Sequence, residues 1–142
     1  MRKCIVLGSV LMIAITACRE DDEDANILGT WKLNISEVRY GDGRTEYITP
    51  NSCKAQTTFT FTNDGKASAK LCERVGTTCM NDTYDGSYTY NASQRLLTLS
   101  YNDYHQNFNV KTLKESELIV LSESLDYDGD GKADNTYLHF TK

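Results

Sequence analysis

The residues best suited to chemistry in this sequence are four aspartates near its carboxyl end. Asp126, Asp128, Asp130 and Asp134 stand in the pattern D-x-D-x-D-G-x-x-D, with a glycine directly after the third acid. Calcium takes about six to eight oxygen ligands, and carboxylates at alternate positions before a sharp glycine turn can supply several of them. The backbone carbonyl of Lys132 would add another. The spacing therefore predicts a calcium site formed by these five residues.

The predicted ligand set is incomplete, because Tyr137 stands at the twelfth position, where calcium loops usually carry a bidentate glutamate. We therefore expect weak binding, at roughly 10⁻⁴ to 10⁻³ M, and a structural role that fixes a long loop. The alternative is a solvated loop between two strands that holds no cation. Calcium is the only cofactor that the sequence suggests, and none is required.

Three cysteines provide a second candidate site. Cys53, Cys72 and Cys79 are an odd number, so one disulfide and one free thiol form the simplest account in an oxidising compartment. We expect the bond between Cys53 and Cys79, which flank a predicted hairpin, although Cys72 also lies within reach of Cys53. No base or paired ligand spacing makes these residues a zinc site or a nucleophile.

Catalytic arrangements are otherwise missing. His105 and His139 lie in strand-like runs, where an exposed or hydrogen-bonded histidine is more common than a ligand or a base. The sequence has no phosphate-binding glycine loop and no metalloprotease motif. We therefore expect a protein that is not an enzyme. The 20 acidic residues against 15 basic ones, a net charge of −5, also argue against a nucleic-acid partner.

The amino-terminal residues have the pattern of a secretory signal. Arg2 and Lys3 precede an apolar run over residues 5–15 that is too short for a permanent membrane span. The junction Ile-Thr-Ala-Cys resembles a bacterial lipobox. This resemblance implies that residues 1–17 are removed as a signal peptide and that the sulfur of Cys18 carries a diacylglycerol.

Residues 18–26 read as an acylated acidic tether, because five acids follow Arg19 in succession and such a block cannot pack. The run resembles the surface-export signal of Bacteroidota lipoproteins. We expect fatty acyl chains such as palmitate to hold the protein on the outer membrane. The resemblance implies exposure on the cell surface, and the alternative is a protein that faces the periplasm.

Residues 27–142 read as one all-β domain, because short alternating runs rich in Thr, Tyr, Val, Leu and Phe are separated by Gly, Asn and Asp. A change of parity predicts a bulge near Glu37. Residues 41–51 and 72–85 are expected as loops. Eight antiparallel strands are predicted at 31–40, 57–62, 67–71, 86–90, 95–101, 105–113, 118–125 and 135–141.

Eight strands in meander order with short connections are best arranged as a small closed barrel, because closure removes exposed sheet edges. An open sandwich of two sheets is the competing arrangement. Five tyrosines fall in the middle hairpins, where they suit either an amphipathic pocket or ordinary cross-strand pairing. They are Tyr84, Tyr88, Tyr90, Tyr101 and Tyr104.

The segment Leu-Gly-Thr-Trp-Lys-Leu over residues 28–33 resembles the Gly-x-Trp signature of lipocalins. The strand order behind it is similar to that of the short lipocalin-like lipoproteins of Bacteroidota. The resemblance implies that Gly29 lets the chain turn across the floor of the barrel and that Trp31 plugs that end.

Two functions follow from these expectations. The favoured one is a non-catalytic, membrane-anchored module that binds a small apolar or amphipathic ligand, since eight-stranded barrels are wide enough to hold one. The alternative is a barrel filled by its own side chains that serves as an accessory of an outer-membrane complex. A core packed solid by apolar residues would favour the alternative, and the candidates for such a core are Phe59, Phe61, Leu97, Leu99, Phe108 and Val110.

Overall fold

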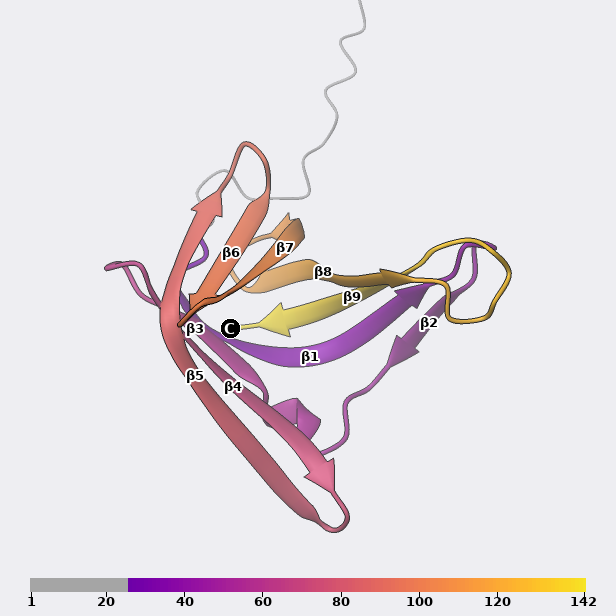
Figure 1. Ribbon diagram of the computed structural model, residues 1–142, viewed down its shortest axis with the longest axis horizontal. Coiled ribbons are helices and arrows are strands. Elements are labelled where there is room, and N and C mark those ends of the chain that lie inside the picture. Colours follow the sequence, from indigo (N-terminus) through magenta and orange to yellow (C-terminus); the bar gives the residue numbers. More distant parts are fainter. Residues whose placement is uncertain (1–25) are drawn as a thin grey trace, which may run out of the picture.

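The computed structural model describes residues 26–142, and these form one antiparallel sheet that closes on itself (Figure 1). The predicted signal peptide (1–17) and Cys18 lie outside the described residues, as does the predicted tether except for Asn26. Within the described part, no helix is long and apolar enough to cross a membrane.

The strands have four to 14 residues, and most follow one another through tight turns, whereas longer segments join β2 to β3 and β8 to β9. In chain order they are β1 Gly29–Arg39, β2 Thr45–Ile48, β3 Thr58–Phe61, β4 Lys66–Val75, β5 Thr78–Asn91, β6 Leu96–Tyr101, β7 Tyr104–Leu113, β8 Glu117–Leu125 and β9 Asp134–Thr141. A short 3-10 helix, η1, spans Lys54–Gln56 between β2 and β3.

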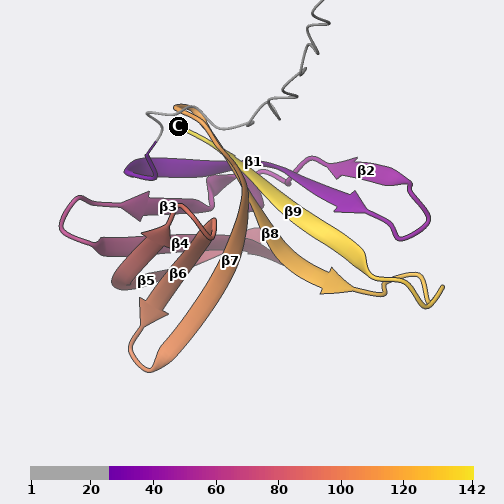
Figure 2. The same ribbon diagram turned by 90° about the horizontal axis from the view of Figure 1, so that it is seen from above.

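The ring closes through β1, which pairs with β3 by residues 29–32 and with β9 by residues 32–39. Strands β3 to β9 pair in sequence order, so eight strands form a closed antiparallel barrel, and β2 adds a ninth strand to the carboxyl-terminal half of β1. Figure 2 shows β9 running beside β1. The predicted all-β barrel of eight strands is confirmed, and the open sandwich is excluded.

Three local expectations are corrected. The prediction of a loop over residues 41–51 is wrong for residues 45–48, which form β2. All four side chains of β2 are exposed, so no pattern of alternating apolar residues marks this strand. Residues 72–85 were also expected as a loop. Most of them continue β4 and β5 as a polar hairpin. The bulge of β1 falls between Leu33 and Ile35 rather than near Glu37.

One end of the barrel is packed with apolar side chains around the fully buried Trp31. The indole N–H of Trp31 donates a hydrogen bond of 2.7 Å to the carbonyl of Ile27, and the Lys142 ammonium lies 4.4 Å from the ring centroid. Gly29 has a φ of +112°, a conformation that L side chains rarely adopt. Gly29 and Trp31 lie at the amino-terminal end of β1, whereas the hollow part of the barrel lies beside its carboxyl-terminal end.

Among the described residues, the strand pairings and the apolar core span residues 27–142. The core joins strands that are far apart in sequence, as in the edge contact between the rings of Phe59 and Phe140, whose centroids are 5.4 Å apart. The described segment therefore contains a closed ring of strand pairings and an apolar core.

A candidate ligand-binding cup

The end of the barrel away from Trp31 is hollow. Two adjoining cavities of about 640 Å³ and about 620 Å³ open there. Both are lined by Phe59, Leu71 and Gln106, so we treat them as two lobes of one cup. Pockets that hold drug-sized ligands span roughly 300–1,000 Å³, and each lobe falls in that range.

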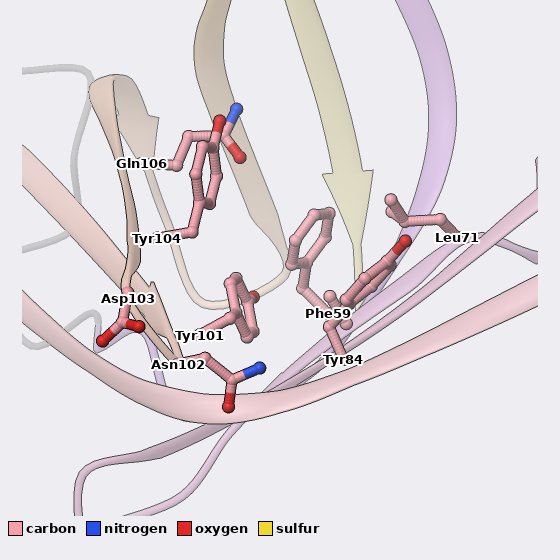
Figure 3. A pocket seen from close by; sticks show the side chains of 9 residues that line it. Phe59, Leu71, Tyr84, Tyr101, Asn102, Asp103, Tyr104 and Gln106 are labelled. Carbon is pink, nitrogen blue, oxygen red and sulfur yellow. The ribbon is translucent and has the colours of Figure 1, made fainter.

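The first lobe, here called the tyrosine lobe, lies between the β4–β5 hairpin and the turn from β6 to β7. Figure 3 shows the rings of Phe59, Tyr84, Tyr101 and Tyr104 around the space. Tyr84 is 44% exposed and Tyr104 is 62% exposed, which is high for aromatic side chains in a concave site. The remaining lining residues are Ala69, Leu71, Asn102, Asp103 and Gln106.

Gly86 positions the ring of Tyr101. A Cβ at Gly86 would lie 2.0 Å from the carbonyl oxygen of Ser100 and 2.8 Å from Cδ1 of Tyr101, so only glycine leaves room for the ring to cross β5. The Tyr101 ring then meets Tyr84 edge to face, with 6.1 Å between centroids. Asn102 takes a φ of +50° in the tight turn that follows.

The hydroxyl of Tyr101 is buried and has no hydrogen-bond partner among the described residues. Burial raises the pKa of Tyr101 to about 12, and the nearby Asp85 carboxylate acts in the same direction. The hydroxyl therefore stays protonated at neutral pH. A buried donor without a partner is unfavourable by roughly 1–3 kcal/mol.

The second lobe, here called the hydroxyl lobe, is more polar. Lys54, Glu73 and Glu123 bring charge to its lining. The Tyr127 hydroxyl donates a hydrogen bond of 2.6 Å to Glu123, and this bond raises the pKa of Tyr127. The hydroxyl groups that line the lobe belong to Ser36, Tyr40, Thr57, Ser122, Tyr127 and Thr136.

The candidates for a solid core do fill part of the barrel. Beneath the cup, a void of only about 20 Å³ remains among apolar side chains from five of the strands. These residues are Phe59, Phe61, Leu97, Leu99, Phe108, Leu118, Val120, Leu138 and Phe140. The barrel is thus filled at one end and hollow at the other.

Three of the predicted calcium ligands come together in the loop between β8 and β9. Carboxylate oxygens of Asp126, Asp128 and Asp130 lie within 4.8 Å of one another, and all three residues are exposed. Basic side chains already approach this cluster. Arg44 forms an ion pair of 2.9 Å with Asp128, and the Lys132 ammonium lies 3.9 Å from Asp130.

Asp134 stands apart from the cluster and is fully buried. Its two carboxylate oxygens accept hydrogen bonds of 2.8 Å each from the backbone N–H groups of Gly41 and Tyr127. The bond from Gly41, helped by the bond from Tyr127, holds the pKa of Asp134 below its usual range. Asp134 therefore ties the acidic loop to the turn between β1 and β2, which lie side by side in Figure 1.

The predicted disulfide between Cys53 and Cys79 is confirmed, and Cys72 is a buried free thiol. Residues 71–75 of β4 and 78–82 of β5 pair only with each other, so they form a two-stranded ribbon that leaves the barrel wall (Figure 1). The disulfide joins this ribbon to the start of η1. It therefore holds in place the segment that carries Leu71 and Glu73 into the cup lining.

Both histidines have partners and neither lines the cup. His105 Nδ1 lies 2.8 Å from the Ser100 hydroxyl, and His139 Nε2 lies 2.7 Å from the Glu37 carboxylate. Sequence reasoning missed Glu37, which is 2% exposed and also pairs with Arg39. The signal for Glu37 in the sequence was an acid where the apolar alternation of the predicted strand 31–40 changes parity.

An antiparallel eight-stranded barrel with a packed floor and a hollow mouth defines a class of cup-shaped β-barrels. The family described as "Lipocalin-like domain" matches residues 27–120, about two-thirds of the chain. The chain belongs to this family of lipocalin-like domains. No curated protein matches the sequence at a significant level.

Two solved structures resemble the fold at low identity. "Odorant Binding Protein OBP1" shares 14% identity, with 81% of this chain and 70% of that chain covered and a TM-score of 0.43. "Bovine Odorant Binding Protein deswapped triple mutant" shares 16% identity, with 80% of this chain and 72% of that chain covered and a TM-score of 0.40.

Proposed function

We propose that the protein is a non-catalytic binding module that takes a small apolar or amphipathic molecule into its cup. The observation that carries this proposal is the hollow mouth of the barrel, where exposed aromatic rings surround a cavity of about 640 Å³. Large aromatic side chains are stabilised by removal from water, so a ligand that covers Tyr84 and Tyr104 would gain that stabilisation on binding.

The non-catalytic part of the proposal is supported by the family, because lipocalin-like domains are typically binding proteins. The alternative of an accessory protein in an outer-membrane complex is supported only by the packed floor, which accounts for one end of the barrel. The hollow end favours the ligand-binding function.

The binding function is tested with the soluble segment 26–142 and the fluorescent apolar dye N-phenyl-1-naphthylamine. We expect saturable binding with a rise in fluorescence. Leu71→Arg should weaken binding by at least about tenfold, because Leu71 lines both lobes and the new charge would have to be buried against a ligand. Val75→Arg is the matched control, since Val75 lies on the same strand, is 59% exposed and does not line the cup.

A wild-type segment that is folded and binds no dye would contradict the proposal. Equal loss of binding in both variants would also contradict it, because the dye would then report general disruption of the β4 strand. Circular dichroism and thermal unfolding establish that each variant is folded before the binding data are compared.

We further propose that the barrel is held on the outer membrane through Cys18, with its cup exposed on the cell surface. The lipobox-like junction and the acidic run after Cys18 support this proposal. Metabolic labelling with a palmitate analogue should modify the full chain and should not modify Cys18→Ser. Degradation of the full-length protein by protease added to intact cells would support the outer face, and protection until the outer membrane is opened would support the periplasmic face.

A further inference from the structure

The hydroxyl lobe offers hydrogen bonds to the polar part of a ligand. Six side-chain hydroxyl groups line it, and hydroxyl groups both donate and accept. Apolar side chains such as Leu33, Val38 and Phe108 also line the hydroxyl lobe. The tyrosine lobe has four aromatic rings and two aliphatic side chains, and among the described residues it offers no hydroxyl groups apart from those of its tyrosines. Because the lobes adjoin at Phe59, Leu71 and Gln106, one molecule can place an apolar part in the first and a polar head in the second.

The charges around this cup are unbalanced. Three carboxylates line the two lobes, namely Asp103 in the tyrosine lobe and Glu73 and Glu123 in the hydroxyl lobe. Within residues 26–142, Lys54 is the only basic side chain in either lining. The cup therefore has an excess of negative charge, in keeping with the net charge of −5 of the whole chain.

A second basic group near the cup is already compensated. The Arg44 guanidinium lies 4.3 Å from the ring centroid of Tyr40, whose side chain lines the hydroxyl lobe. The same guanidinium forms ion pairs with Asp42 and Asp128. Arg44 therefore adds little net attraction for an anionic group that enters the lobe.

We infer that the cup takes neutral or cationic amphiphiles and discriminates against anionic ones such as fatty acid anions; this inference rests on the proposed function. A carboxylate head in the hydroxyl lobe would meet Glu73 and Glu123 with a single lysine to offset them. Juxtaposed like charges in a partly desolvated site oppose binding. An ammonium or hydroxyl head meets no such opposition. Tyr40 and Tyr127 already donate to Glu46 and Glu123, but their hydroxyl oxygens can still accept a hydrogen bond from such a head.

The test compares three ligands with the same alkyl chain, decan-1-ol, decylammonium and decanoate, each displacing the naphthylamine dye from the segment 26–142. At about pH 8 the amine is protonated and the acid is ionised. We expect the alcohol and the ammonium to bind at least about tenfold more tightly than decanoate at low ionic strength, and the difference to narrow in high salt.

A double variant tests whether Glu73 and Glu123 cause the preference for cationic over anionic ligands. Glu73→Gln with Glu123→Gln should reduce the preference for decylammonium over decanoate by several-fold, because it removes two of the lining carboxylates. Asp82→Asn is the matched control, since Asp82 is exposed on β5 and lines neither lobe. It should leave the preference unchanged.

The outcomes separate this inference from the proposed function. Decanoate binding as tightly as the alcohol or more tightly overturns the inference and leaves the binding function intact. If Lys54→Gln then abolishes decanoate binding, the lobe is an anion site centred on Lys54. Absence of binding for the dye and all three ligands overturns both the function and the inference.

Discussion

At the scale of single residues, Glu37 is the most unusual group outside the cup. It is 2% exposed and lies on the outer side of β1, where it pairs with Arg39 and His139. The Arg39 guanidinium also stacks over the Tyr137 ring, 4.7 Å from its centroid. Burial acts to raise the pKa of Glu37, but the hydrogen bonds from Arg39 and His139 outweigh it and hold the pKa below its usual range.

This arrangement predicts that the free energy of unfolding falls as the pH is lowered. A carboxylate whose pKa is lower in the folded state stabilises the fold above its unfolded pKa and loses that contribution as the pH falls through the lower, folded value. Glu37→Gln should lower the free energy of unfolding at pH 7 by roughly 1–3 kcal/mol. The gap between variant and wild type should begin to shrink as the pH falls below the unfolded pKa of about 4.3, and it should close once the pH lies below the lower, folded pKa, where Glu37 is protonated in both states.

Thermal unfolding between about pH 3 and pH 7 measures this gap. Glu46→Gln serves as control, because Glu46 is an exposed acid on the neighbouring strand β2. A gap for Glu37→Gln that stays the same at every pH would contradict the ionic role of this side chain.

Calcium binding by the acidic loop stays a prediction at this scale. Arg44 already neutralises part of the charge on Asp128, so we expect it to compete with a cation. Arg44→Gln should therefore raise calcium affinity several-fold, whereas Asp128→Asn with Asp130→Asn should abolish binding. Calorimetric titration of the segment 26–142 measures both effects. No heat of binding in either the wild type or Arg44→Gln would leave the loop as a solvated turn.

At the scale of elements, the β4–β5 ribbon is the part of the fold that depends most on a covalent bond. Its residues beyond the barrel wall pair only with each other, and a lone pair of strands is marginally stable in water. The Cys53–Cys79 bond closes a loop over a sequence separation of 26 residues. By chain entropy such a closure stabilises the folded state by about 3 kcal/mol.

Replacing both partners, Cys53→Ser with Cys79→Ser, should therefore lower the melting temperature and speed amide hydrogen exchange in the ribbon. Dye binding should weaken as well, since the ribbon carries Leu71 and Glu73 into the cup lining. A reducing agent should destabilise the wild type by a similar amount and leave the variant unchanged. Unaltered exchange in the ribbon would show that η1 and the barrel hold it without the bond.

At the scale of the whole molecule, the barrel divides into a packed half that stabilises the fold and a hollow half that is free to bind. Trp31 and the apolar cluster around it fill the first half, and the cup occupies the second. This division places the site on a closed sheet whose every strand has two neighbours over most of the ring. Changes to the cup lining should then leave the fold largely intact.

Ligand binding should accordingly stabilise the whole domain. A ligand that binds only the folded state at a free concentration of about 100 times its dissociation constant raises the free energy of unfolding by about 2.7 kcal/mol. Decan-1-ol should raise the melting temperature of the wild type in a concentration-dependent way and should have little effect on Leu71→Arg. An equal shift in both proteins would indicate nonspecific binding outside the cup.

The sequence by itself determined the strands whose apolar side chains alternate. The run at 57–62, with Phe59 and Phe61, and the run at 105–113, with Phe108 and Val110, are β3 and β7 to within a few residues. The turn that follows Phe61 placed Cys53 near both Cys72 and Cys79, because a hairpin aligns residues at equal distances from its turn. The structure made the choice, since Cys79 returns on β5 opposite Arg74 and bonds to Cys53. Local patterns of period two carry this information, and they require no knowledge of distant contacts.

Only the tertiary structure decided what the barrel contains. Strand β2 and the ribbon carry mostly exposed side chains, so nothing in their local pattern distinguishes them from loops. Whether the barrel is hollow depends on which inward side chains meet across it. The ring of Phe59 meets that of Phe140, whereas Tyr84 and Tyr104 line open space. Closure brings these residues together from strands far apart in sequence, and packing across the ring is set by their combined volumes rather than by any neighbouring residue.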